Sequence, residues 1–125
     1  EKEIYIGDEL KIGNCLFQIS QPRIPCYKIG IKMNSRDFPK KFSQSGLLGS
    51  YLRVLETGSI SKNDEIEYIR KESDSLSVYE IAEILFKDVN NIDQMKKAVD
   101  LKYLTEEIKE RFRERLMKLG DYSSL

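Results

Sequence analysis

The chain has 125 residues, of which 40% are hydrophobic and 34% are charged, and its formal net charge is +0. This length is sufficient for one ordinary domain or for two very small ones. The balanced charge argues against nucleic acid or an anionic membrane as the main partner, and no apolar run approaches the roughly 20 residues that span a bilayer.

The histidine and cysteine content limits the kinds of active site and metal site that the chain can form. The chain has no histidine, which excludes a Ser-His-Asp or Cys-His hydrolase built from this chain alone and a His-containing zinc site. The two cysteines, Cys15 and Cys26, form no CxxC motif. Together with the lack of a visible signal peptide, this pattern is typical of a cytoplasmic protein with free thiols.

Residues 1–72 are predicted to form short β-strands. Polar and apolar residues alternate in EIYIGDELKIGNCLFQIS, with turns expected at Gly7 and Gly13. The stretches GSYLRVLETGSIS and NDEIEYIRK predict further strands, and SRDFPKKFSQSG predicts a short helix between strands. Cys15 belongs to an alternating strand, so we expect it to pack in the core.

From residue 73 onward the sequence changes from a strand pattern to a helix pattern. Ser77, Asn91 and Thr105 are expected helix N-caps, and Glu80 completes a capping box with Ser77. The expected apolar faces of the first and third helices consist of Val78, Ile81, Ala82 and Leu85, and of Ile108, Phe112, Leu116 and Leu119. We therefore predict a mixed fold, with a β domain over residues 1–72, a linker near residues 70–75 and a small three-helix domain over residues 73–125.

The sequence SQPRIPCYK, residues 20–28 and called the signature segment below, places Cys26 directly after a proline. Pro25 suits the first turn of a helix, where backbone N–H groups and the helix dipole stabilise an anion. Because Arg23 and Lys28 lie nearby, the thiol is expected to ionise readily, which favours a nucleophile or a soft-metal ligand. The alternative is that Cys26 is a small buried hydrophobic residue.

Three stretches of the sequence resemble the MOSC domain, the module shared with the C-terminal end of molybdenum cofactor sulfurases. FQISQPRIPCYKIG is similar to the signature of the family, IYIGDELKIGNCLFQIS to its upstream strands, and SGLLGSYLRVLETGSISKNDEI to its downstream strand and turn. The three helices resemble the 3-alpha domain of the YiiM-like branch. The resemblance implies a MOSC-type β-barrel portion followed by a three-helix domain. Because the N-terminal half of the family has no counterpart here, the barrel is expected to lack strands unless another polypeptide supplies them.

The resemblance also implies a cofactor. MOSC proteins handle the molybdenum cofactor, a molybdopterin that carries molybdenum, and the matching cysteine, Cys26, would be the molybdenum ligand. The residues expected to hold the anionic phosphate of the pterin are Ser20, Gln21, Arg23 and Lys28. Arg53 is a further candidate. For Arg23 and Arg53 the alternative is a solvated surface cation.

YiiM-like proteins are associated with the reduction of N-hydroxylated compounds such as hydroxylaminopurines. The electrons would come from a separate donor protein, since nothing in the chain resembles a flavin or iron–sulfur site. The third predicted helix could dock that partner, or it could only cover the barrel, and a homodimer is compatible with the sequence. Two other functions stay open: a sulfur carrier with a persulfide on Cys26, and a non-catalytic interaction module with a structural thiol.

Overall fold

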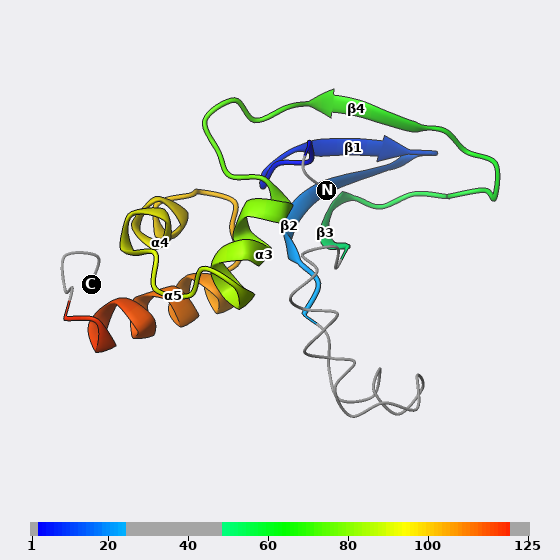
Figure 1. The fold of residues 1–125 in the computed structure, drawn as a ribbon. Coiled ribbons are helices and arrows are strands. Elements are labelled where there is room, and N and C mark those ends of the chain that lie inside the picture. Colours follow the sequence, from blue (N-terminus) through cyan, green and yellow to red (C-terminus); the bar gives the residue numbers. More distant parts are fainter. Residues whose placement is uncertain (1–2, 25–48, 121–125) are drawn as a thin grey trace, which may run out of the picture.

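The computed structural model describes residues 3–24 and 49–120. In this part of the chain a four-stranded antiparallel sheet lies beside three helices, which confirms the mixed fold (Figure 1). The strands are β1 (Glu9–Ile12), β2 (Cys15–Pro22), β3 (Ser50–Glu56) and β4 (Ile66–Arg70). The helices are α3 (Val78–Phe86), α4 (Ile92–Val99) and α5 (Glu106–Lys118). The short helix expected in SRDFPKKFSQSG lies outside the described residues.

The sheet has the strand order β3-β2-β1-β4, so β2 is an inner strand. Strands β1 and β2 form a hairpin in which Ile12 pairs with Cys15. Gly13 lies in the turn with a φ of +58°, a left-handed conformation that glycine adopts without steric cost, and this confirms the turn predicted there. The register between β2 and β3 shifts between Ile19 and Gln21. Such a bulge bends the strand locally, and it lies where β2 enters the signature segment.

The three helices begin at the predicted N-caps. The Ser77 hydroxyl accepts a hydrogen bond from the Glu80 backbone N–H at 3.0 Å, and the Glu80 carboxylate accepts one from the Ser77 backbone N–H at 3.1 Å, which confirms the capping box. Asn91 and Thr105 cap α4 and α5. The prediction for Leu119 was wrong, because α5 ends one residue earlier and Leu119 is left exposed. Within the described ranges, no helix is long and apolar enough to cross a membrane.

One hydrophobic core connects the sheet to the helices. In Figure 1 α3 lies against β2, with α4 and α5 on the side of α3 away from the sheet. The strand region contributes Ile6, Leu10 and Ile19 to the core, and the largest buried contributions of the helices are Ile81, Leu85, Met95, Ile108, Phe112 and Leu116. The core therefore crosses the boundary expected between residues 72 and 73, while the division into two domains stays a prediction.

Strands β3 and β4 extend away from the helices (Figure 1). Both strands expose large apolar side chains. The most exposed of these side chains is Ile66, at 64%. The others on the two strands are Tyr51, Leu52, Val54, Leu55, Tyr68 and Ile69. Single apolar residues are common on protein surfaces, but their concentration on two edge strands is typical of a surface that another polypeptide covers.

A buried carboxylate joins the start of the sheet to the connection between β4 and α3. Asp8 is 0% exposed. One of its oxygens accepts a hydrogen bond from the Tyr5 backbone N–H at 3.0 Å, and the other accepts one from the Glu72 backbone N–H at 2.7 Å. A buried carboxylate is stable when both oxygens have partners. The segment expected to be a linker is therefore bonded to the N-terminal strand region.

Replacing Asp8 by asparagine tests this connection. The Asp8→Asn side chain keeps the shape but turns one acceptor oxygen into an amide donor that faces a backbone N–H. We expect the free energy of unfolding to fall by about 2 kcal/mol, the range for a lost buried hydrogen bond to a charged group. Urea unfolding measures this change, and Asp74→Asn, at an exposed position of the same connection, should change it by less than about 0.5 kcal/mol. Equal effects of the two variants would contradict the structural role of Asp8.

Candidate functional site

The candidate site begins at the last residues of β2, where the chain enters the signature segment. Ser20 is buried, and its hydroxyl donates a hydrogen bond to the Tyr51 backbone oxygen on β3 at 3.0 Å. This bond crosses the two strands at the bulge, where the regular ladder is interrupted. Ser20 thus holds β2 to β3 at the base of the site, and its contact with a cofactor stays a prediction.

Gln21 is buried and both ends of its side-chain amide have partners. The amide oxygen accepts a hydrogen bond from the Thr105 hydroxyl at 2.7 Å, and the amide nitrogen donates to the Pro22 backbone oxygen at 3.2 Å. The local sequence pattern indicates Thr105 only as a helix cap. It does not indicate the contact with Gln21, because Gln21 and Thr105 are 84 positions apart. Gln21 therefore contacts a helix cap and the backbone, and its role as a cofactor ligand also stays a prediction.

Arg23 is exposed, whereas Ser20 and Gln21 are buried. Its backbone N–H donates a hydrogen bond to the Gly49 backbone oxygen at 3.0 Å, so the position of the main chain is fixed while the side chain faces outward. An exposed guanidinium can pair with phosphate or carboxylate through two parallel hydrogen bonds. Of the predicted site residues that the structure describes, Arg23 is the exposed one. Its contact with an anionic ligand stays a prediction.

The remaining two predicted site residues, Cys26 and Lys28, lie outside the described residues, as does the helix start expected at Pro25.

Arg53 has partners that compete with a role in ligand binding. One guanidinium nitrogen donates to the Gln18 side-chain oxygen at 2.6 Å, and the other lies 3.5 Å from the Tyr103 backbone oxygen. These contacts connect β3 to β2 and to the turn between α4 and α5. The structure therefore gives Arg53 a place in the scaffold around the site.

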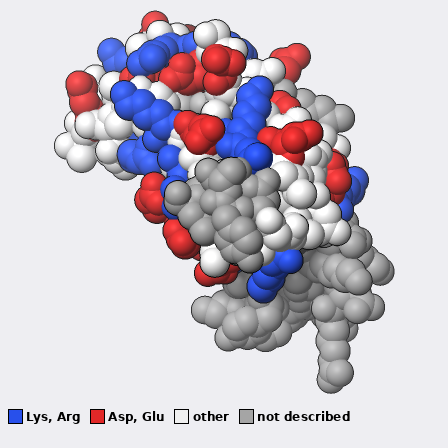
Figure 2. Space-filling model, turned by 90° about the vertical axis from the view of Figure 1, so that its left-hand side faces the viewer, with Lys and Arg blue, Asp and Glu red and all other residues white. Residues whose placement is uncertain are grey.

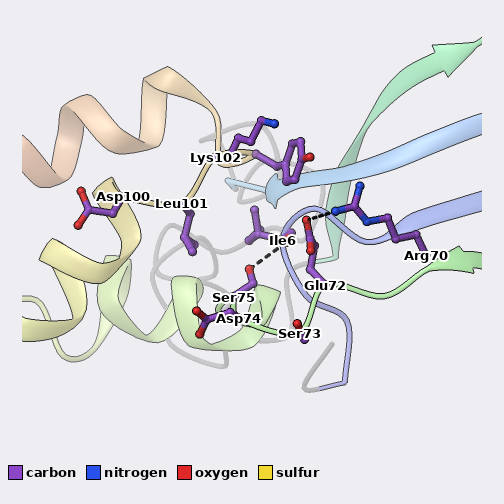
Figure 3. A pocket seen from close by; sticks show the side chains of 10 residues that line it. Ile6, Arg70, Glu72, Ser73, Asp74, Ser75, Asp100, Leu101 and Lys102 are labelled. Atoms are coloured by element: carbon purple, nitrogen blue, oxygen red, sulfur yellow. Dashed lines mark hydrogen bonds and ion pairs between the residues drawn. The ribbon is translucent and has the colours of Figure 1, made fainter.

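A cavity of about 370 Å³ lies elsewhere, between the β4–α3 connection and the α4–α5 turn (Figure 3). Its charged groups do not converge on a common point, because the Lys102 ammonium points away from the carboxylates of Asp74 and Asp100 in Figure 3. The Arg70 guanidinium is paired with Glu72 at 3.4 Å. In addition, no group of three or more potential His, Cys, Asp or Glu metal ligands occurs among the described residues. Among the described residues, the charged groups that line this cavity are thus not gathered around one point.

The face of the molecule shown in Figure 2 carries intermingled charges of both signs. On α5, Arg113 pairs with Glu106 at 3.2 Å and with Glu110 at 2.9 Å, so charges of both signs also lie together on this helix. Alternating charges that neutralise one another give little long-range attraction for a strongly charged partner. The docking of a donor protein on α5 stays a prediction.

Comparison with known proteins assigns the chain to a protein family. The family model for the MOSC domain matches residues 1–67, which include the whole signature segment. The chain therefore belongs to the MOSC domain family, as its sequence predicted. The family is associated in general with binding of the molybdenum cofactor, so membership points to a role connected with that cofactor.

The individual relatives place the chain among the YiiM-like members of the family. It is 30% identical over 106 residues to the uncharacterized protein YflK of Bacillus subtilis, covering 85% of this chain and 48% of that protein. It is 33% identical over 84 residues to the protein YiiM of Escherichia coli, covering 67% and 37%. A protein of Gibberella moniliformis named reductase is 30% identical over 86 residues, covering 68% and 15%.

Solved structures show the same relationship in three dimensions. YiiM from Geobacillus stearothermophilus superimposes with a TM-score of 0.87 at 33% identity, covering 93% of this chain and 60% of that one. YiiM from Escherichia coli gives a TM-score of 0.87 at 27% identity, covering 99% and 62%. The chain thus spans less than half the length of the curated relatives and about three fifths of the solved ones.

The thiol of Cys15 should be unreactive in the folded chain. Cys15 is 6% exposed at the start of β2 and is confirmed as a core residue. We expect iodoacetamide to leave Cys15 unmodified in the folded chain and to modify it readily in urea, because burial blocks access to the sulfur. Peptide mapping by mass spectrometry assigns the modified residue. Rapid modification of Cys15 under native conditions would contradict the packing of β2.

Proposed function

We propose that this chain carries the cofactor-handling cysteine of a YiiM-like MOSC protein and that Cys26 is a molybdenum ligand. The observation that carries the proposal is that the signature segment begins in the last residues of an inner strand, β2, which side-chain hydrogen bonds connect to β3 and to the cap of α5. A thiolate is a soft, strongly donating ligand suited to such a metal. Residues of a site need a rigid base of this kind to hold a ligand in one geometry.

The charge at the strand end fits an anionic cofactor. Arg23 is exposed directly after β2, and Lys28 follows Cys26 by two residues. In the proposal these two cations hold the phosphate of the molybdopterin, while Ser20 and Gln21 belong to the strand that presents them. Arginine suits this task because its planar guanidinium can donate two hydrogen bonds to one phosphate.

The proposed reaction is the reduction of N-hydroxylated compounds, with hydroxylaminopurines as the model substrates. In the net change, R–NHOH takes up two electrons and two protons and gives R–NH₂ and water. The bound cofactor would supply a centre that changes oxidation state by two electrons, and a separate electron-donor protein would supply the reductant. The relative named reductase supports a redox role for this part of the family.

The sheet is proposed to form part of a MOSC β-barrel, with α3, α4 and α5 as the three-helix domain that follows it. Two observations support this. The edge strands β3 and β4 expose large apolar side chains, and a barrel would bury those on its inner face. In addition, the superimposed YiiM structures contain more chain than is matched here. Further strands placed against β3 and β4 would cover this surface and remove both open edges.

Molybdenum and pterin content tests the proposed role of Cys26. We expect the protein isolated from cells with an ample cofactor supply to contain molybdenum in near-stoichiometric amount, and we expect Cys26→Ser to lose it, because a hydroxyl is a much poorer ligand than a thiolate. Cys15→Ala is the matched control: it removes the other thiol, which is buried in the core, and should retain the metal.

Two outcomes would count against this function. If neither the wild type nor Cys15→Ala contains molybdenum, the proposed binding of the molybdenum cofactor is wrong. A labile sulfur trapped on Cys26 would then favour a function as a sulfur carrier. If Cys26→Ser retains as much molybdenum as the wild type, the metal is held by other residues.

A further inference from the structure

The cavity between the β4–α3 connection and the α4–α5 turn is lined by charged groups of both signs, which lie at different ends of it (Figure 3). The Lys102 ammonium and the Arg70 guanidinium lie toward the top and the right of the view. The carboxylates of Asp100 and Asp74 lie toward the left and the bottom. We propose that this cavity binds a small zwitterion of the amino acid class, with its carboxylate at the cationic end and its ammonium at the anionic end.

At the cationic end two positive groups lie over one aromatic ring. The Lys102 ammonium nitrogen is 5.3 Å from the centroid of the Tyr103 ring, and the Arg70 guanidinium carbon is 6.0 Å from it. Arg70 is also paired with Glu72 at 3.4 Å and with Glu9 at 3.7 Å, so much of its charge is neutralised. Since Lys102 has no carboxylate partner among the described residues, its ammonium is the main attraction for a carboxylate.

The aromatic ring between these cations is held in place by its surroundings. Tyr103 packs against the backbone of Gly7, where φ is +96° and an added Cβ would lie only 2.7 Å from the ring carbon Cδ2. The Arg53 guanidinium donates to the Tyr103 backbone oxygen at 3.5 Å. The cationic end is therefore formed before a ligand arrives, and a preformed site loses little conformational entropy on binding.

At the anionic end two carboxylates lack a cation. In the described part of the chain, neither Asp74 nor Asp100 has an ion-pair or hydrogen-bond partner for its side chain. An ammonium group has three N–H donors and can therefore meet more than one carboxylate. The Ser75 hydroxyl donates to the Ile6 backbone oxygen at 2.8 Å, which attaches the segment that carries Asp74 to the start of the sheet.

The middle of the cavity suits the chain between the two charges of such a ligand. Ile6 and Leu101 lie between the two ends in Figure 3, and both are buried side chains of the core. They present hydrocarbon to the cavity, which a methylene chain can contact without leaving a polar group unpaired. The cavity volume of about 370 Å³ lies within the range of small-molecule sites.

Three probes of equal length test the proposal in NMR titrations of the 125-residue chain. 6-Aminohexanoate carries both charges, hexanoate carries only the carboxylate, and hexylammonium carries only the ammonium. We expect 6-aminohexanoate to shift the backbone amide signals of Asp74 and Lys102 and to bind roughly five-fold more tightly than either other probe. Each singly charged probe lacks one ion pair, and an exposed ion pair has about this effect.

Two variants assign the ends of the ligand. Asp100→Asn and Lys102→Gln remove one charge each at exposed positions, and each should weaken the binding of 6-aminohexanoate roughly five-fold. Asp100→Asn should leave the binding of hexanoate no weaker, and Lys102→Gln should leave that of hexylammonium no weaker. Asp93→Asn and Lys118→Gln are the matched controls, because they remove exposed charges of the same signs outside the cavity, and they should leave all affinities unchanged.

Two results would overturn the zwitterion site. One is that 6-aminohexanoate shifts no amide signal of the cavity residues or binds no more tightly than the singly charged probes. The other is an equal loss of affinity in the control variants, which would show that only the overall charge of the chain matters. None of the described residues predicted to hold the molybdenum cofactor lines this cavity, so failure of the proposed function would leave this inference standing.

Discussion

The buried carboxylate of Asp8 is the contact on which the arrangement of sheet and helices depends. It accepts backbone hydrogen bonds from Tyr5 and from Glu72, which are far apart in the sequence. Backbone bonds continue this attachment on both sides, from Ile6 to Leu76 and from Val78 to Ile4. The start of α3 is therefore held against the first residues of the sheet. With α3 attached in this way, the apolar faces of the helices pack in one core with residues of β1 and β2.

The shared core gives the helices a part in the site as well as in the fold. The end of β2 is held by side-chain hydrogen bonds to β3 and to the cap of α5, while the core beneath it is formed largely by helix residues. A MOSC signature strand on its own would lack these contacts. This explains in physical terms why a helical unit accompanies the strand region in this chain.

Local sequence patterns correctly predicted the structural features that depend on residues close together in the chain. The caps at Ser77, Asn91 and Thr105, the turn at Gly13 and the buried Cys15 were all correct because each follows from side chains a few positions apart. The family resemblance added the identity of the signature segment. Leu119 was misplaced because the apolar period continues past the residue where the helix ends. The bonds of Gln21 with Thr105 and of Asp8 with Glu72 join residues 84 and 64 positions apart, and no local periodicity encodes such pairs.

Because the strands and the helices share one hydrophobic core, we expect them to unfold as one cooperative unit. Hydrogen exchange of the wild-type chain at increasing urea concentration tests it most directly, because each amide reports the free energy of the opening that exposes it. We expect the amides of β1, β2, α3 and α5 to lose protection at the same urea concentration. Protection that persists in α3 and α5 after β1 and β2 have exchanged would contradict this expectation, because it would show that the helices unfold independently of the strands.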